Sequence, residues 1–192
     1  MYEYFEGKLA SLEPTQAVID CGGVGYLLEI TLNTYEDLRK ADAARVRLYA
    51  HLVVREDAHQ LYGFYDMAER EMFRLLVAVN GVGNQTARVM LSSLTVDELR
   101  SAIQTQDVKK VQRVKGIGAK TAQRIVLELQ DKVSALGAEP GKAPAAMSQS
   151  KEEALGALVM LGFPKAAADK VLQSLDGSLT VEELIKEALK RI

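Results

Sequence analysis

The sequence predicts a multidomain α+β protein, with an N-terminal β-barrel followed by two helical units. Three observations in its 192 residues support this prediction. Up to about residue 64 apolar and polar residues alternate, whereas from residue 66 the apolar residues recur with the period of an α-helix. The first helical unit contains one short phrase twice, 35 residues apart. A stretch of small and polar residues with proline and glycine then separates it from the last unit.

Five runs with a period of two predict five short strands in residues 1–64. In the clearest run, residues 45–54, apolar side chains occupy one face at every second position. The other runs are residues 3–9, 16–21, 24–30 and 58–63, with a short helix over residues 34–40 before the fourth strand. Five short strands with one helical insertion are typical of a closed or partly closed barrel of the OB type.

Residues 65–133 predict four or five short helices. Asp66-x-x-Glu69 and Thr95-x-x-Glu98 have the spacing of capping boxes, which mark the beginning of a helix. The inward faces are expected to come from six apolar residues, Leu75, Leu76, Val79, Val89, Met90 and Leu94. We therefore expect a compact helical unit after the barrel.

The repeated phrase is an apolar residue, a Gly-apolar-Gly turn, and a helix that opens with Thr-Ala, at residues 79–87 and 114–122. Glycine allows a positive φ and a close approach of the backbone. The first turn of a helix leaves N–H groups unpaired at the positive end of its dipole, where a phosphate binds well. Two matched copies therefore predict two turns that bind phosphates of the same nucleic-acid backbone. The alternative is a pair of tight turns between packed helices, without a ligand.

The predicted DNA-binding residues lie in both turns and in the helices after them. They are Asn80, Gly81, Val82, Gly83, Gln85 and Arg88 in the first copy, and Lys115, Gly116, Ile117, Gly118, Lys120 and Arg124 in the second. Lys120 and Arg124 are four residues apart and share a helix face, and Arg88 has nearly the equivalent position after the first turn. No nucleotide site is expected, because neither copy has the glycine pattern of a Walker A loop or of a dinucleotide fingerprint.

The distribution of charge also favours nucleic acid. Residues 66–133 carry 11 basic and 8 acidic side chains and are the only segment with a net positive charge. Residues 1–65, by contrast, carry 6 basic and 10 acidic side chains. A positive stripe attracts phosphate independently of base sequence and in a salt-dependent way.

Other features exclude several classes of site. Cys21 is the only cysteine, and His51 and His59 do not have the spacing of metal ligands, so that neither a metal nor another cofactor is expected. No apolar run reaches the length of a membrane span, and the N-terminus is not a signal peptide. We expect a soluble, cytoplasmic protein without a membrane partner.

Residues 134–150 are predicted to form a flexible linker, because SALGAEPGKAPAAMSQS is small, polar and without periodicity. Residues 151–192 predict three helices. Ser150-x-x-Glu153 and Thr180-x-x-Glu183 are expected to cap the first and third, and Gly162 and Pro164 to separate the first from the second. We expect this unit to be a recruitment module; permanent docking onto the rest of the chain is the alternative.

Six stretches of the sequence resemble the RuvA family, whose members bind Holliday junctions in the bacterial branch-migration complex. They are residues 21–26 (CGGVGY), 51–58 (HLVVREDA), 61–64 (LYGF), 80–83 (NGVG), 116–122 (GIGAKTA) and 157–163 (ALVMLGF). The resemblance implies an OB barrel, a tandem helix-hairpin-helix domain and a mobile, UBA-like C-terminal domain that contacts the RuvB ATPase motor. It also implies a homotetramer that holds a four-way junction open for branch migration in recombination and DNA repair, and allows for an octamer and for the RuvC resolvase as a further partner.

The resemblance also implies roles for residues that composition does not single out. Glu56 and Asp57 correspond to an acidic pin at the centre of the junction, where carboxylates repel phosphates over a Debye length of about 8 Å. Leu158, Leu161 and Phe163 are expected to contact the motor, which hydrolyses the ATP, so that this chain itself is not an enzyme. Family members often carry lysine in place of Gln85 and Ala119, which predicts that the first turn binds phosphate more weakly here.

Two rival functions remain open at this point. One is a subunit of a DNA glycosylase or nuclease that uses the turns for non-specific grip, although no catalytic residue or metal cluster accompanies them. The other is a scaffold in which the turns pack against protein.

Overall fold

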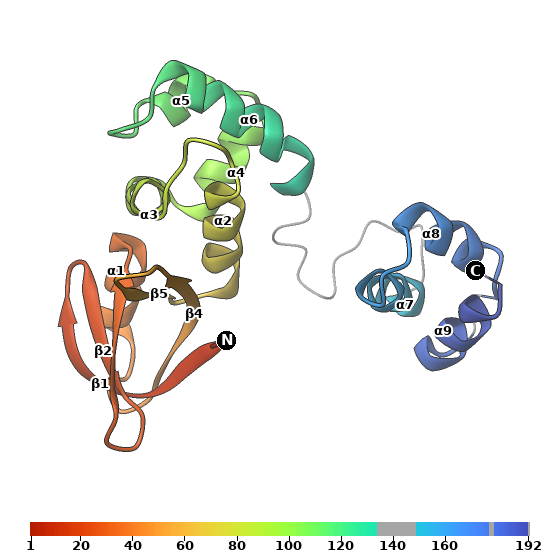
Figure 1. Ribbon diagram of the computed structural model, residues 1–192, viewed down its shortest axis with the longest axis horizontal. Coiled ribbons are helices and arrows are strands. Elements are labelled where there is room, and N and C mark those ends of the chain that lie inside the picture. Colours follow the sequence, from red (N-terminus) through yellow and green to blue (C-terminus); the bar gives the residue numbers. More distant parts are fainter. Residues whose placement is uncertain (134–148, 177–178, 192) are drawn as a thin grey trace. The chain divides into compact units, whose positions relative to one another are not determined.

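The computed structural model describes residues 1–133, 149–176 and 179–191 of the chain (Figure 1). It divides into two units, Met1–Gly137 and Ala138–Ile192, each of which we describe by itself. The predicted linker, residues 134–150, lies outside the described residues apart from its last two, which belong to a helix.

The first unit begins with a closed barrel of five strands, which confirms the predicted OB-type fold. The strands are β1 (Tyr4–Glu13), β2 (Gln16–Asp20), β3 (Gly25–Ile30), β4 (Val46–Val54) and β5 (His59–Phe64), with helix α1 (Leu32–Lys40) between β3 and β4. They follow the order β1-β2-β3-β5-β4, and neighbours are antiparallel except for β3 and β5. The inward side chains form one core, which includes Phe5, Ile19, Leu28, Ile30, Leu48 and Ala50.

Strand β1 is longer than predicted, because it has two successive partners. Residues 4–7 pair with β4, and residues 8–13 pair with β2. Gly7 lies where the strand passes from one partner to the other, and a Cβ atom there would be 2.1 Å from the carbonyl oxygen of Asp20. Only glycine allows this close approach, which lets the sheet close on itself.

Five helices follow, as the periodicity predicts. They are α2 (Met67–Val77), α3 (Asn84–Ser93), α4 (Val96–Gln104), α5 (Val108–Gln112) and α6 (Ala119–Val133). Their shared core includes the predicted Leu76, Val79 and Met90, while Leu75, Val89 and Leu94 are partly buried against it. Thr95 and Glu98 form the complete predicted capping box of α4.

The predicted capping box at Asp66 is only half right. The Asp66 side chain accepts a hydrogen bond from the Glu69 N–H, as an N-cap should. The Glu69 side chain turns away, however, and accepts hydrogen bonds from the hydroxyls of Thr31 at 2.5 Å and Thr34 at 2.6 Å, at the beginning of α1. Tertiary contact with the barrel therefore takes the place of the local cap.

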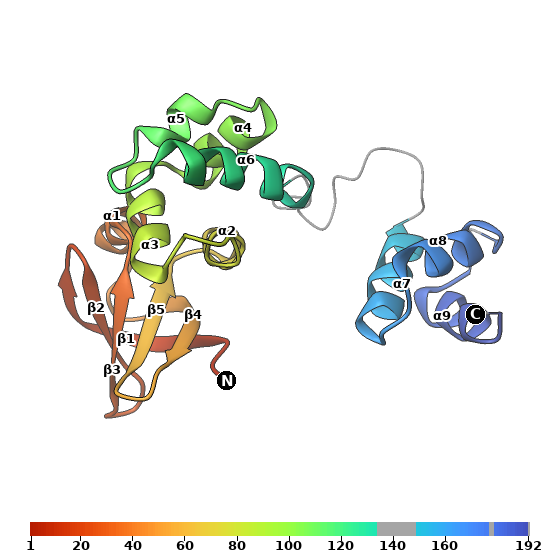
Figure 2. The ribbon, with the colours of Figure 1, turned by 45° about the horizontal axis from the view of Figure 1, so that its top comes forward.

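Glu69 is one of several polar contacts that join the barrel to the helices. Its neighbour Arg70 is 3% exposed and donates hydrogen bonds to the carbonyl and carboxylate oxygens of Glu3, at 2.9 and 2.6 Å. Asn33 of α1 donates to the carbonyl oxygen of Leu91 at 2.6 Å. Helix α2 also packs against β4 and β5 (Figure 2). The barrel and helices α2–α6 thus form one tightly connected unit.

The second unit contains three helices, α7 (Gln149–Met160), α8 (Lys165–Gln173) and α9 (Val181–Leu189). Gly162, with φ +95°, follows α7, Pro164 is the N-cap of α8, and Thr180 and Glu183 form the predicted capping box of α9. The predicted cap at Ser150 is wrong, because α7 already includes that residue. In the part of the chain that the structure describes, no helix is long and apolar enough to cross a membrane.

Candidate nucleic-acid interface

Each Gly-x-Gly phrase forms a turn between two helices. The first turn, residues 80–83, connects α2 to α3, and the second turn, residues 115–118, connects α5 to α6. Gly81 and Gly116 have φ angles of +92° and +91°, a conformation that other residues rarely adopt. Gly83 and Gly118 have no positive φ, and no atom lies within 4 Å of the place that a Cβ would occupy. Gly81 and Gly116 are therefore required by the backbone of the turns, whereas Gly83 and Gly118 leave the surface of the turns open.

The two turns share one hydrogen-bond pattern. The Val82 N–H donates to the Val79 carbonyl at 3.0 Å, and the Ile117 N–H donates to the Val114 carbonyl at 3.1 Å. In the helices that follow, the Ala87 and Ala122 N–H groups donate to the Gly83 and Gly118 carbonyls, both at 2.9 Å. The three residues before each of these alanines, 84–86 and 119–121, lie in the first turn of the helix, where N–H groups have no partner within the helix. Both turns can therefore present these N–H groups to a ligand.

Two of the predicted DNA-binding residues anchor the turns in the core. The side chains of Val82 and Ile117 are buried, 5% and 6% exposed, and belong to the core of the helical unit. Their N–H groups are bonded inside the turns. Val82 and Ile117 therefore hold the turns in place, and a contact of these two residues with DNA stays a prediction.

The exposed predicted residues at the two turns differ in charge. Asn80 and Gln85 are exposed at the first turn, and Lys115 and Lys120 at the second. Arg124 of α6 connects the two, since its Nη1 donates to the carbonyl oxygen of Asn80 at 3.0 Å. A Cβ on Gly81 would also lie 3.9 Å from the hydroxyl of Thr121 in α6. The structure thus places the first turn against the helix that begins at the second.

Arg88 is not placed with the other predicted residues. It forms an ion pair with Glu29 of β3, donates to the Thr15 carbonyl at 3.3 Å, and its side chain is 12% exposed. In the 35-residue repeat, the equivalent of Arg88 is Gln123 and not Arg124. One residue corresponds to a rotation of roughly 100° around a helix, which turns Arg88 toward the barrel.

The predicted acidic pin lies in the hairpin between β4 and β5. The Arg55 N–H donates to the Ala58 carbonyl at 2.8 Å and closes a four-residue turn. Glu56 and Asp57 occupy the centre of this turn, and both are exposed. We call these two residues the acidic tip. Their carboxylates lie in the same unit as both Gly-x-Gly turns.

The three predicted motor-binding residues differ in exposure. Leu158 is fully buried, Phe163 is partly buried against the core of the second unit, and Leu161 is 62% exposed. Two neighbours that were not predicted, Val159 and Met160, are 42% and 92% exposed. The sequence does contain the signal: Ala154 and Leu158 are four residues apart and mark the inner face of α7, which leaves Met160 outside.

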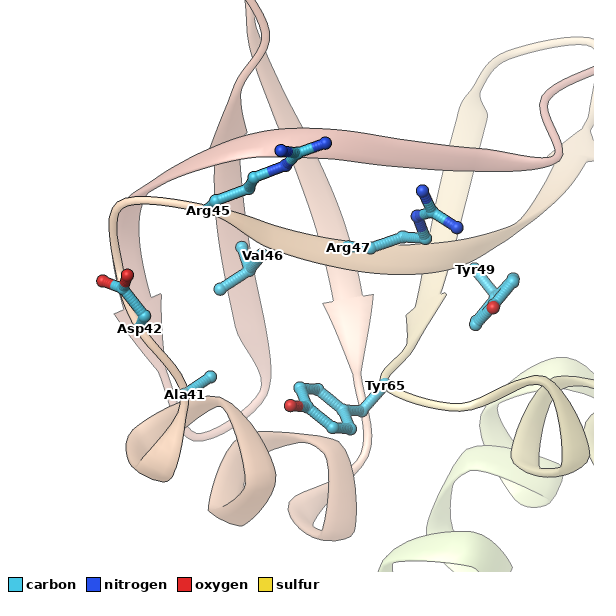
Figure 3. Close-up of a pocket in the computed structure, with 7 residues that line it drawn as sticks. All are labelled: Ala41, Asp42, Arg45, Val46, Arg47, Tyr49 and Tyr65. Carbon is cyan, nitrogen blue, oxygen red and sulfur yellow. The ribbon is translucent and has the colours of Figure 1, made fainter.

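The barrel has a separate pocket of about 300 Å³ beside the end of α1, lined in part by Arg45, Arg47 and Tyr65 (Figure 3). The two arginines contact the Glu6 carboxylate at 2.6 and 2.7 Å. Their hydrogen bonds lower the pKa of Glu6. Since both cations have this carboxylate partner, the pocket is a weaker candidate for phosphate than the turns.

Comparison with known proteins covers all three predicted domains. The model of the RuvA N-terminal domain matches residues 1–63, that of a SAM-like helix-hairpin-helix tandem residues 73–131, and that of the RuvA C-terminal domain residues 149–192. Similar full-length relatives include proteins of Christiangramia forsetii, 46% identical with 100% of both chains covered, and Cytophaga hutchinsonii, 45% identical with 99% of both covered. A Bacteroides thetaiotaomicron protein is 45% identical with 100% of both covered. All three are named Holliday junction branch migration complex subunit RuvA.

Proposed function

Since this chain belongs to the RuvA family, we propose that it binds four-way (Holliday) DNA junctions and acts as the junction-binding subunit of a branch-migration complex. The observation that carries the proposal is the pair of turns with one backbone geometry, linked through Arg124 and Asn80. Each turn offers helix-start N–H groups to one phosphate, and the first turn lies against the helix that begins at the second.

The grip on DNA is independent of base sequence. Backbone N–H groups and exposed lysines such as Lys115 and Lys120 recognise phosphates, which every sequence presents alike. Preference for a junction then comes from the arrangement of several copies of the chain. In a homotetramer, four pairs of turns would hold the four arms of the junction apart. Duplex DNA cannot occupy all four pairs in this way.

The acidic tip supplies the repulsive part of the mechanism. Carboxylates of Glu56 and Asp57 repel phosphates within about 8 Å at physiological salt, so that the tips turn strands away from the crossover. This works only if the tip keeps its position relative to the turns. Contacts of Glu69, Arg70 and Asn33 between the barrel and its neighbouring elements support that geometry.

The second unit recruits the motor. Val159 and Met160 at the end of α7, and Leu161 directly after it, form an exposed apolar patch that is suited to a protein partner. In this proposal the RuvB ATPase binds there and supplies the energy for branch migration, and the chain itself has no catalytic role. Octamer formation and contact with the RuvC resolvase are compatible with it and are not required.

The test compares the affinity of the purified chain for an immobile four-way junction with its affinity for a duplex of the same arm sequence, over a range of salt concentrations. We expect the junction complex to persist at salt concentrations that dissociate the duplex complex. Equal affinities for the two DNAs at every salt concentration would contradict the proposal.

A further inference from the structure

The two copies of the repeat are unequal in charge. With an offset of 35 residues, Lys120 of the second copy corresponds to Gln85, and Arg124 corresponds to Val89. The remaining basic residue near the first turn, Arg88, is committed to Glu29. The first copy therefore has the same backbone geometry for binding a phosphate as the second copy. It has no cation at the positions of Lys120 and Arg124, which are Gln85 and Val89.

The missing cation is supplied from the other copy. Arg124 belongs to α6, yet its Nη1 lies 3.0 Å from the carbonyl oxygen of Asn80 in the first turn. Its Nε lies 3.7 Å from Glu128 one helical turn further on, which directs the side chain along the helix. The side chain is 49% exposed. Because a guanidinium has five N–H donors, it can hold the Asn80 carbonyl and also donate to a phosphate.

We propose that Arg124 is the positioning residue of the first turn, although it stands in the second copy. It fixes the Asn80 carbonyl, whose partial negative charge would otherwise oppose an anion, and it brings a positive charge to the phosphate that the first turn holds. Lys120, one helical turn earlier, serves the second turn. This inference rests on the proposed function and deepens it, since it makes the first turn dependent on the second copy.

The chain offers a matched pair of variants to test this division. Gly83→Ala and Gly118→Ala each add one methyl group to an open surface, where a phosphate would approach the first or the second turn. Each is combined with Arg124→Ala and with Lys120→Ala, and the dissociation constant for a four-way junction is measured for every single and double variant. Such a cycle detects whether two residues act on the same contact.

Arg124→Ala alone should weaken junction binding roughly tenfold, as for loss of one charged hydrogen bond. We expect this loss to shrink markedly when Gly83→Ala already blocks the first turn, and to remain in full beside Gly118→Ala. Lys120→Ala should show the opposite pattern. Coupling of Arg124 to Gly118 instead of Gly83 would overturn the proposal.

A second measurement needs no DNA. Hydrogen exchange of residues 79–87 in the full chain should become faster in Arg124→Ala, because the hydrogen bonds of Val82 and Ala87 open more often when Asn80 is released. Lys120→Ala should leave it unchanged. Arg124→Lys should keep the salt dependence of junction binding, since the charge remains, and lose the protection, since lysine lacks the planar fork.

Unchanged exchange in both Arg124 variants would overturn the positioning role. If the wild-type chain showed no preference for a junction, the proposed function would fail, while the exchange experiment would still decide whether Arg124 holds the first turn.

Discussion

The carboxylate of Glu69 in α2 accepts a hydrogen bond of 2.5 Å from the hydroxyl of Thr31, the N-cap of α1. This contact joins the helical hairpins to the barrel inside a buried site. Burial raises the pKa of Glu69 to about 7 from an ordinary value of 4.5, although the bonds from Thr31 and Thr34 oppose the rise. The linkage between barrel and helices therefore depends on pH.

Stability should fall as the pH rises through the pKa of Glu69. Between pH 4.5 and about 7 the folded chain holds a proton on Glu69 that the unfolded chain releases. The contribution of Glu69 to the free energy of unfolding is therefore fully present below pH 4.5 and is lost as the pH rises to about 7. Glu69→Gln should remove this slope from the free energy of unfolding, measured with urea at a series of pH values. Glu71→Gln, a more exposed neighbour, is the control. A slope that persists in Glu69→Gln would assign it to another group.

The two glycines of the first turn should respond differently to alanine. Gly81→Ala should lower the free energy of unfolding by about 1–2 kcal/mol, because Gly81 has a φ of +92°. Gly83→Ala should leave stability nearly unchanged and weaken junction binding, because its methyl group would point into open space. Denaturant unfolding and a binding titration on both variants check this. Normal junction binding by Gly83→Ala would argue that the first turn does not touch DNA closely.

Lys120 should contribute one phosphate contact. Lys120→Ala should lower the slope of log K against log salt concentration by about one unit. Lys132→Ala is a matched control, since this lysine is exposed on the same helix. It lies about 18 Å further along α6. If both variants changed the slope equally, the effect would reflect net charge and not a contact.

The acidic tip should oppose DNA binding while it guides the strands. With Glu56→Gln and Asp57→Asn combined, we expect junction affinity to be kept or raised, because repulsion of phosphate is removed. Branch migration with the motor should become slower or less regulated. Junction affinity and the rate of branch migration are both measured with a four-way junction whose arm sequences allow the branch point to move. A loss of junction binding would instead give the two carboxylates a structural role.

The exposed end of α7 should matter for the motor and not for DNA. Leu161→Asp should abolish recruitment of the ATPase motor and leave junction affinity unchanged, since Leu161 is 62% exposed. Leu158→Ala should destabilise the second unit by about 2–5 kcal/mol, because Leu158 is fully buried. Co-sedimentation with the motor and thermal unfolding separate the two effects. Intact recruitment by Leu161→Asp would move the contact elsewhere.

Local patterns predicted what local interactions determine. Strand periodicity located β2–β5 to within two residues at each end, and the capping boxes of α4 and α9 formed as expected. Residues 10–13 of β1 were missed; they continue the pairing with β2 that begins after the strand changes partner at Gly7.

The site was harder to predict, because side-chain direction depends on packing between elements. A shift of one position turns Arg88 to Glu29 on the barrel, and the barrel also draws Glu69 away from its own helix cap. The spacing of Lys120 and Arg124 indicated one helix face, but nothing in the sequence indicated that Arg124 reaches back to Asn80. That contact exists only once the two copies are packed together.

The glycines differ in what would preserve them during evolution. At Gly7 any side chain would collide with the Asp20 carbonyl, so barrel architecture alone forbids replacement. Gly83 and Gly118 face open space, so that folding places little constraint on them. If natural selection keeps glycine at those two codons across distant lineages, the pressure must come from something that touches the protein from outside.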